Sequence, residues 1–126
     1  MKIYGIGTDI VSVDRIKKSL KNKNFVNRLF DKNEIKKCNN QVNKANCYAK
    51  RFAAKEAFSK AIGTGISKGI NFNEIIVMNE RNGKPFIKLK GETMRSIKKK
   101  FKKKLKISLS LSDEKKYAVA FVTISL

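Results

Sequence analysis

Residues 51–65 read RFAAKEAFSKAIGTG, and this stretch has the composition of a long helix. Alanine, lysine and glutamate favour helices, and the pattern extends back to about Ala45. Gly63 and Gly65 permit the left-handed backbone that ends helices. Small side chains recur at every fourth position of the predicted helix: Ala49, Ala53, Ala57 and Ala61. The sequence therefore predicts one dominant helix with a narrow face that another element approaches closely.

Two charged residues, Glu56 and Lys60, lie one turn apart on this largely apolar helix. One interpretation is an ordinary salt bridge between residues i and i+4 at the edge of a core helix. The other is that Glu56 ligates a divalent metal ion while Lys60 faces a phosphate. A second carboxylate nearby would favour the metal.

Asp9 is the candidate for that second carboxylate. Residues 2–11 alternate as a strand, and one face of it is predicted to carry Ile3, Gly5, Gly7, Asp9 and Val11. Glycines weaken a strand and mark places where another group approaches the backbone closely. The alternative is that Asp9 caps a short amphipathic helix that begins near Ser12, but a cap would leave both glycines unexplained.

The rest of the chain alternates between short helices and strands. Asn82-Gly83 between two apolar runs predicts a β-hairpin, and residues 91–105 predict a lysine-rich amphipathic helix. Residues 107–112 alternate strictly, and residues 117–126 form a nearly continuous apolar strand that must lie in the core or an interface. We predict an α+β fold in one domain, residues 1–126, with an antiparallel sheet packed on one long central helix and short flanking helices.

Composition sets the limits on function. The chain has 30 Lys and Arg against 10 Asp and Glu, so its formal charge of +20 attracts polyanions. It contains no histidine, which excludes histidine bases and histidine metal sites. Cys38 and Cys47 lack CxxC spacing, so neither a zinc site nor a disulfide framework is expected. The apolar runs are too short to span a bilayer and the first residues lack a signal-peptide layout, so we expect a cytoplasmic protein without a membrane partner.

Together, residues 5–10, 51–65 and 82–85 resemble the motifs of the holo-[acyl-carrier-protein] synthases, the small bacterial type of 4′-phosphopantetheinyl transferase. The family's early G-x-D is met by Gly7 and Asp9, and its aromatic-x-x-K-E-A-x-x-K segment by residues 52–60. The resemblance covers essentially the whole chain. One departure is Asp113, which stands where many members carry a histidine, so no histidine base can act at that position.

The resemblance implies transfer of the 4′-phosphopantetheine group from coenzyme A to a serine of apo acyl carrier protein. Adenosine 3′,5′-bisphosphate is released, and the reaction serves fatty acid biosynthesis. Asp9 and Glu56 match the family's ligands for Mg2+, and Lys60 completes the implied catalytic set. Glu56, Asp9 and a metal-bound water all stay open as the base that removes the serine proton.

The resemblance also implies binding surfaces. The residues implied for coenzyme A are Arg51, Lys60, Gly63, Asn82, Gly83, Lys84 and Pro85, with Arg51 and Lys84 as candidates for its 3′-phosphate. Arg15 and Arg28 are implied to dock the acidic carrier protein. The family forms trimers with active sites at subunit interfaces, so we expect a homotrimer in which the last two strands are places to look for the contact.

A binding-only protein is the rival from another class. Lysines at 98–100 and 102–104 could make the chain a nucleic-acid-associated module, because phosphate contacts need no special fold. That interpretation leaves Asp9 and Glu56 unexplained and finds the aromatic residues in core patterns, so we expect no nucleic-acid partner. Magnesium-dependent binding of coenzyme A discriminates between the two.

Overall fold

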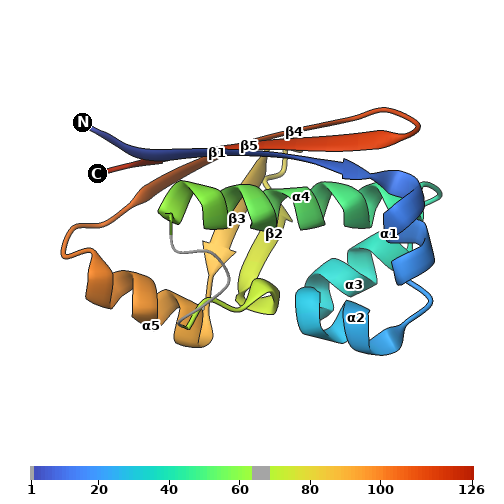
Figure 1. Cartoon of the computed structure of the whole chain (residues 1–126), viewed down its shortest axis with the longest axis horizontal. Helices are drawn as coiled ribbons and strands as arrows, with labels where there is room; N and C mark the ends of the chain where they lie inside the picture. The colour runs from blue at the N-terminus through green and yellow to red at the C-terminus, as the bar shows by residue number, and fades with distance from the viewer. Residues whose placement is uncertain (1, 64–68) are drawn as a thin grey trace.

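The predicted central helix is α4 (Lys44–Ile62), and it runs through the middle of the molecule (Figure 1). The structure is a computed structural model that describes residues 2–63 and 69–126. Gly63 ends α4 in the left-handed conformation with φ 87°, as predicted, whereas Gly65 lies outside the described residues. All four alanines of the small-residue stripe are buried.

A three-stranded antiparallel sheet covers one side of α4 (Figure 1). Its strands follow the order β1 (Ile3–Ser12), β5 (Tyr117–Ser125), β4 (Lys106–Asp113). Strand β5 alternates, so that Ala118, Ala120, Val122 and Ile124 are buried while Phe121 on the opposite face is 45% exposed. The last strand therefore contributes one face to the core and leaves an apolar face outside.

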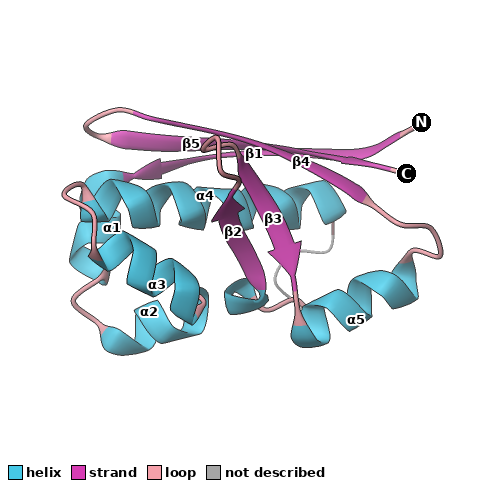
Figure 2. Ribbon diagram, turned by 180° about the vertical axis from the view of Figure 1, so that it is seen from behind, coloured by secondary structure: helices cyan, strands magenta, loops and turns pink. Residues whose placement is uncertain are grey.

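Most of the remaining elements lie on the other side of α4, while the hairpin runs alongside α4 and its turn reaches the sheet (Figure 2). Helices α1 (Val13–Ser19), α2 (Lys23–Leu29) and α3 (Lys32–Asn39) gather at one end. The predicted hairpin of β2 (Ile75–Asn79) and β3 (Pro85–Leu89) crosses the middle, after a 3-10 turn at Phe72–Glu74. Helix α5 (Gly91–Lys100) covers the other end. The fold class is thus the predicted α+β, and none of the described helices combines the length and the apolar character needed to cross a membrane.

Two details differ from the predicted elements. The pairing of β1 with β5 shifts register between Ile3 and Gly5, so Ile3 is 67% exposed instead of sharing the face of Asp9. Tyr4, which is 40% exposed, packs edge-on against the Phe101 ring with centroids 4.7 Å apart, and its hydroxyl donates to the Ile62 carbonyl oxygen at 3.5 Å. Helix α5 ends five residues earlier than predicted because Phe101 takes an extended backbone.

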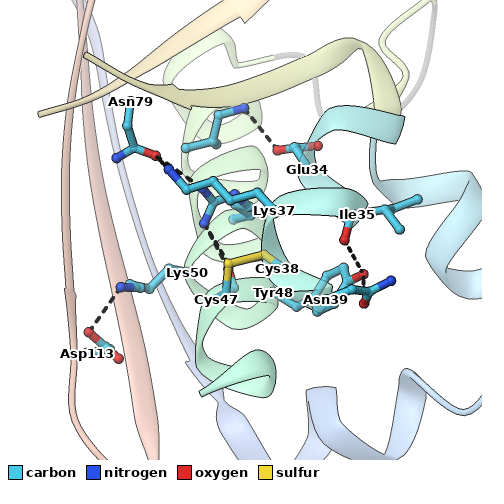
Figure 3. The surroundings of a disulfide bond; sticks show 12 residues. Glu34, Ile35, Lys37, Cys38, Asn39, Cys47, Tyr48, Lys50, Asn79 and Asp113 are labelled. Atoms are coloured by element: carbon cyan, nitrogen blue, oxygen red, sulfur yellow. Dashed lines mark hydrogen bonds and ion pairs between the residues drawn. A yellow bond between two sulfur atoms is a disulfide. The ribbon is translucent and has the colours of Figure 1, made fainter. Parts of the chain in front are cut away.

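The expectation about the cysteines was wrong: Cys38 and Cys47 form a disulfide with Cα atoms 5.4 Å apart. Only residues 40–43 separate α3 from α4, so the end of the first helix lies against the start of the second (Figure 3). A spacing rule derived from CxxC motifs and multi-bridge frameworks does not detect one bridge between two consecutive helices.

A buried ion pair ties α4 to the elements around it. The Lys55 ammonium donates to a Glu34 carboxylate oxygen at 2.7 Å and to the Phe72 and Ile75 carbonyl oxygens. Glu34 forms a capping box with Asp31 and also accepts from the Val77 amide at 2.9 Å. Burial lowers the pKa of Lys55, but its three acceptors satisfy the charged form. This pair fixes the helix segment that carries Glu56.

Candidate active site

Strand β1 brings Asp9 to α4 because its glycines allow direct backbone contact. A Cβ atom on Gly7 would lie 1.9 Å from the Ala57 carbonyl oxygen, and one on Gly5 would lie 2.0 Å from that of Ala61. Any side chain at these positions would push the strand off the helix. The prediction that the glycines mark a close approach is confirmed, and the approaching element is α4 itself.

Lys60 pairs with Asp9 rather than with Glu56. Its ammonium lies 3.2 Å from Asp9 Oδ1 and 3.0 Å from the Thr8 carbonyl oxygen. The lysine side chain stays 56% exposed, whereas the Asp9 side chain is 17% exposed. Lys60 on α4 therefore forms its ion pair with Asp9 on β1. Among the described residues, the salt bridge between Lys60 and Glu56 that their spacing allowed is not formed. Asp9 is also not a helix cap, since Ser12 caps α1.

Glu56 faces the same cavity as Asp9. This cavity has a volume of about 420 Å³, and Arg15 and Phe52 also line it. The pKa of Glu56 is raised, first by burial and then by the negative charge of Asp9, while Lys60 acts in the opposite direction. A partly buried carboxylate whose ionisation is opposed by a neighbouring negative charge is typical of a functional site.

The two carboxylates fit a magnesium ion. Mg2+ prefers oxygen ligands and takes one or two protein carboxylates, leaving the remaining positions to water and substrate phosphates. Asp9 and Glu56 line the same cavity and would supply the two carboxylate ligands of such an ion. The donor set suits a metal that meets its substrate.

A second cavity, of about 220 Å³, contains the predicted nucleotide-binding residues Arg51, Gly83 and Pro85. Gly83 takes the positive φ of 91° that the hairpin turn requires, and Asn82 Oδ1 accepts from the Lys84 amide at 3.0 Å within the same turn. This cavity shares no lining residue with the one that holds Asp9 and Glu56. Within one chain, the structure thus divides the predicted site into two parts.

The remaining predicted residues lie at separate places. Arg15 lines the cavity of the two carboxylates, and Arg28 is exposed on α2. Gly63 follows Lys60 at the end of α4, whereas positions 64 and 65 of the glycine-rich segment fall outside the described residues.

Sequence reasoning missed four polar residues around the second cavity: Lys37, Gln41, Lys50 and Asn79. Lys37 and Asn79 lie far apart in the chain, and no motif links them. Asp113, the residue that departs from the family pattern, lies 3.5 Å from the ammonium of Lys50 and accepts from Asn46 Nδ2 at 2.8 Å. Its charge is therefore compensated locally.

Comparisons with known proteins agree on one family. A sequence profile of the 4′-phosphopantetheinyl transferase superfamily matches residues 5–122. A holo-[acyl-carrier-protein] synthase of Pelagibacter ubique is 51% identical over 125 residues, covering 98% of both chains. The crystal structure of the Neisseria meningitidis synthase superposes with a TM-score of 0.90 at 37% identity, covering 99% of this chain and 100% of that one. The Bacillus anthracis synthase, solved in complex with CoA (3′,5′-ADP), gives 0.80 at 36% identity, covering 97% and 96%.

Proposed function

This chain belongs to the 4′-phosphopantetheinyl transferase superfamily, and from that premise we propose that it moves phosphopantetheine from coenzyme A to a serine of apo acyl carrier protein. Residues 1–126 act as one transferase domain in the cytoplasm, release adenosine 3′,5′-bisphosphate and serve fatty acid biosynthesis. The observation that carries the proposal is the meeting of Asp9, Glu56 and Lys60, because an anionic pyrophosphate needs both a metal and a lysine beside it.

Asp9 and Glu56 would hold Mg2+ in this site. When bound, that ion neutralises the pyrophosphate of coenzyme A and favours departure of the nucleotide. The protein's own part is to hold both carboxylates against one cavity, which the contact between β1 and α4 achieves. Lys60 offers its ammonium, a flexible point charge, to a pyrophosphate oxygen.

The second cavity would bind the nucleotide end of coenzyme A. The adenine and ribose-phosphate would lie against the turn at residues 82–85, of which Gly83 and Pro85 line this cavity together with Arg51. Arg51 and Lys84 would bind the 3′-phosphate, and Gly63 would lie close to the pyrophosphate. Because the two cavities are separate within one chain, we propose that a homotrimer completes each site from two copies. The outer face of the three-stranded sheet suits that contact, since Ile6 and Ile10 on it are 61% and 65% exposed.

Arg15 and Arg28 would dock the carrier protein. Arg15 lies at the cavity of the two carboxylates, so an acidic partner bound there presents its serine to the metal site. Arg28, exposed on the neighbouring helix α2, extends the basic surface. Complementary charge speeds the encounter of such partners and orients them.

The test is mass spectrometry of apo acyl carrier protein incubated with this protein, coenzyme A and Mg2+. We expect the mass of the carrier protein to rise by one phosphopantetheine group, and expect both chelation of the metal and Glu56→Gln to prevent the rise. Arg28→Ala should keep the transfer chemistry and lower kcat/KM for the carrier protein. If folded protein adds no mass to several carrier proteins, the proposed activity is wrong.

A further inference from the structure

The second cavity is lined by three cationic side chains from two helices. Lys37 comes from α3, and Lys50 and Arg51 come from α4. The carboxamide of Asn79, at the end of β2, points toward Lys37 (Figure 3). Like charges repel when they are gathered in one place, so such a cluster needs an anion to balance it.

Asn79 holds two of these cations in place. Its Oδ1 accepts from the Lys37 ammonium at 2.5 Å and from Arg51 Nη2 at 3.3 Å. Its Nδ2 donates to the Gly83 carbonyl oxygen at 3.0 Å, which fixes the orientation of the amide. The hairpin turn, Lys37 and Arg51 are thereby organised around one side chain before any ligand arrives.

The helix-to-helix disulfide supports the same arrangement. Cys38 follows Lys37 directly, and the Cys47 carbonyl oxygen and Sγ accept from Arg51 Nη1 at 3.3 and 3.1 Å. The bond between the two cysteines therefore connects the backbone segments that carry the two cations (Figure 3).

Two of the three positive charges at this cavity are not balanced by a salt bridge within the described part of the chain. Lys50 is paired with Asp113 at 3.5 Å, but in the described part of the chain neither Lys37 nor Arg51 forms a salt bridge. The Arg51 side chain is buried, with its residue 4% exposed, and its Nε has no hydrogen-bond partner among the described atoms. Burial and the charges of Arg51 and Lys50 lower the pKa of Lys37, which an anion would reverse.

We propose that Lys37 is a second phosphate-binding residue beside Arg51, and that the pair recognises a dianionic phosphate monoester. Given the proposed function, on which this inference rests, that monoester is the 3′-phosphate of coenzyme A. A phosphate monoester carries a charge of about −1.5 to −2 at pH 7, which two cations match. Lys37 then determines specificity: it favours coenzyme A over dephospho-coenzyme A, which lacks this phosphate.

The experiment compares Lys37→Met with Lys36→Met, an exposed lysine one position earlier on α3. For each variant, kcat/KM is measured with coenzyme A and with dephospho-coenzyme A from the rate at which the carrier protein gains mass. We expect Lys37→Met to lower kcat/KM for coenzyme A by about 10- to 100-fold, as for loss of a charged hydrogen bond. The value for dephospho-coenzyme A should stay within about 2-fold of wild type. Lys37→Arg should restore most of the preference, and Lys36→Met should change neither value.

The inference fails separately from the proposed function. If the wild type transfers the group and Lys37→Met keeps the wild-type ratio of kcat/KM between coenzyme A and dephospho-coenzyme A, Lys37 does not bind the 3′-phosphate. If the wild type transfers nothing, the proposed activity is wrong. The phosphate-binding role of Lys37 is then tested by the rise in melting temperature with adenosine 3′,5′-bisphosphate, compared with the rise with 5′-AMP. The inference is supported if the bisphosphate raises the melting temperature of the wild type more than 5′-AMP does and this difference is lost in Lys37→Met. It is overturned if the bisphosphate raises the melting temperature of the wild type and of Lys37→Met equally.

Discussion

The negative charge of Glu56 destabilises the folded protein, and we propose that the same charge binds the metal ion. Its raised pKa means that the folded state holds the proton more tightly than the unfolded state does, because burial and Asp9 disfavour the charge. Above the raised pKa, ionised Glu56 therefore weakens the fold, and this loss disappears as the pH falls below the ordinary glutamate range. In EDTA, we expect Glu56→Gln to raise the melting temperature at pH 7 to 8, with a difference from wild type that vanishes near pH 4.

The same substitution should remove most of the transferase activity, by about 100-fold or more, since a bound metal contributes several kcal/mol to such transition states. Glu114→Gln, in an exposed turn, is the control and should change neither property. The assignment is wrong if Glu56→Gln destabilises the metal-free protein at neutral pH, because the carboxylate would then be a structural acceptor. Scanning calorimetry across pH, paired with carrier-protein mass, gives both readouts.

At the scale of elements, the contact between β1 and α4 makes the site. Gly7→Ala places a methyl group where the Ala57 carbonyl oxygen already lies, so the strand must move away from the helix. We expect a loss of about 1–3 kcal/mol in the free energy of unfolding, together with a large fall in kcat as Asp9 leaves Glu56.

Gly83→Ala, in the hairpin turn, is the matched control for Gly7→Ala. Its Cβ meets no atom within 4 Å, but its backbone φ of 91° is unfavourable for alanine. It should cost about 1–2 kcal/mol from backbone strain. Because residues 82–85 are proposed to bind coenzyme A, its effect on activity should appear in KM, with kcat near that of wild type. Denaturant unfolding and carrier-protein kinetics on both variants separate the two effects. Equal losses of kcat would contradict a positioning role for Gly7.

The sequence reveals elements whose causes are local. The alanine stripe and Gly63 predict α4, and Asn82-Gly83 predicts the hairpin, because composition and turn chemistry act over a few residues. Asp9 and Glu56 stand out because a carboxylate on a glycine-rich strand and one on a buried helix each break the local pattern.

Features that depend on contacts between distant segments stay hidden in the sequence. The Lys55–Glu34 pair and the Asn79-centred cation pair each join segments that only the fold brings together. The register shift after Ile3 likewise arises from pairing with β5 and has no signal in β1 itself. These are tertiary effects, which periodicity and motif spacing do not encode.

At the scale of the whole molecule, the proposed homotrimer is what would join the two separate cavities into one site. We expect light scattering to give about three times the 14.3 kDa chain mass. Ile6→Glu, on the exposed apolar face of the sheet, should dissociate the trimer because a charge cannot be buried there without a partner. The dissociated protein should lose activity even where circular dichroism shows that it stays folded.

Mixing two inactive variants tests whether the sites are shared. Glu56→Gln removes a ligand of the proposed metal half of the site, and Arg51→Met removes a cation of the proposed nucleotide half. If each site takes one half from each of two neighbouring copies, random trimers of an equal mixture rebuild about a quarter of the sites. Unfolding and refolding the two variants together should therefore restore about a quarter of wild-type activity, whereas each variant treated alone stays inactive. No recovery in a mixture that light scattering shows to be trimeric would place both halves of the site in one chain.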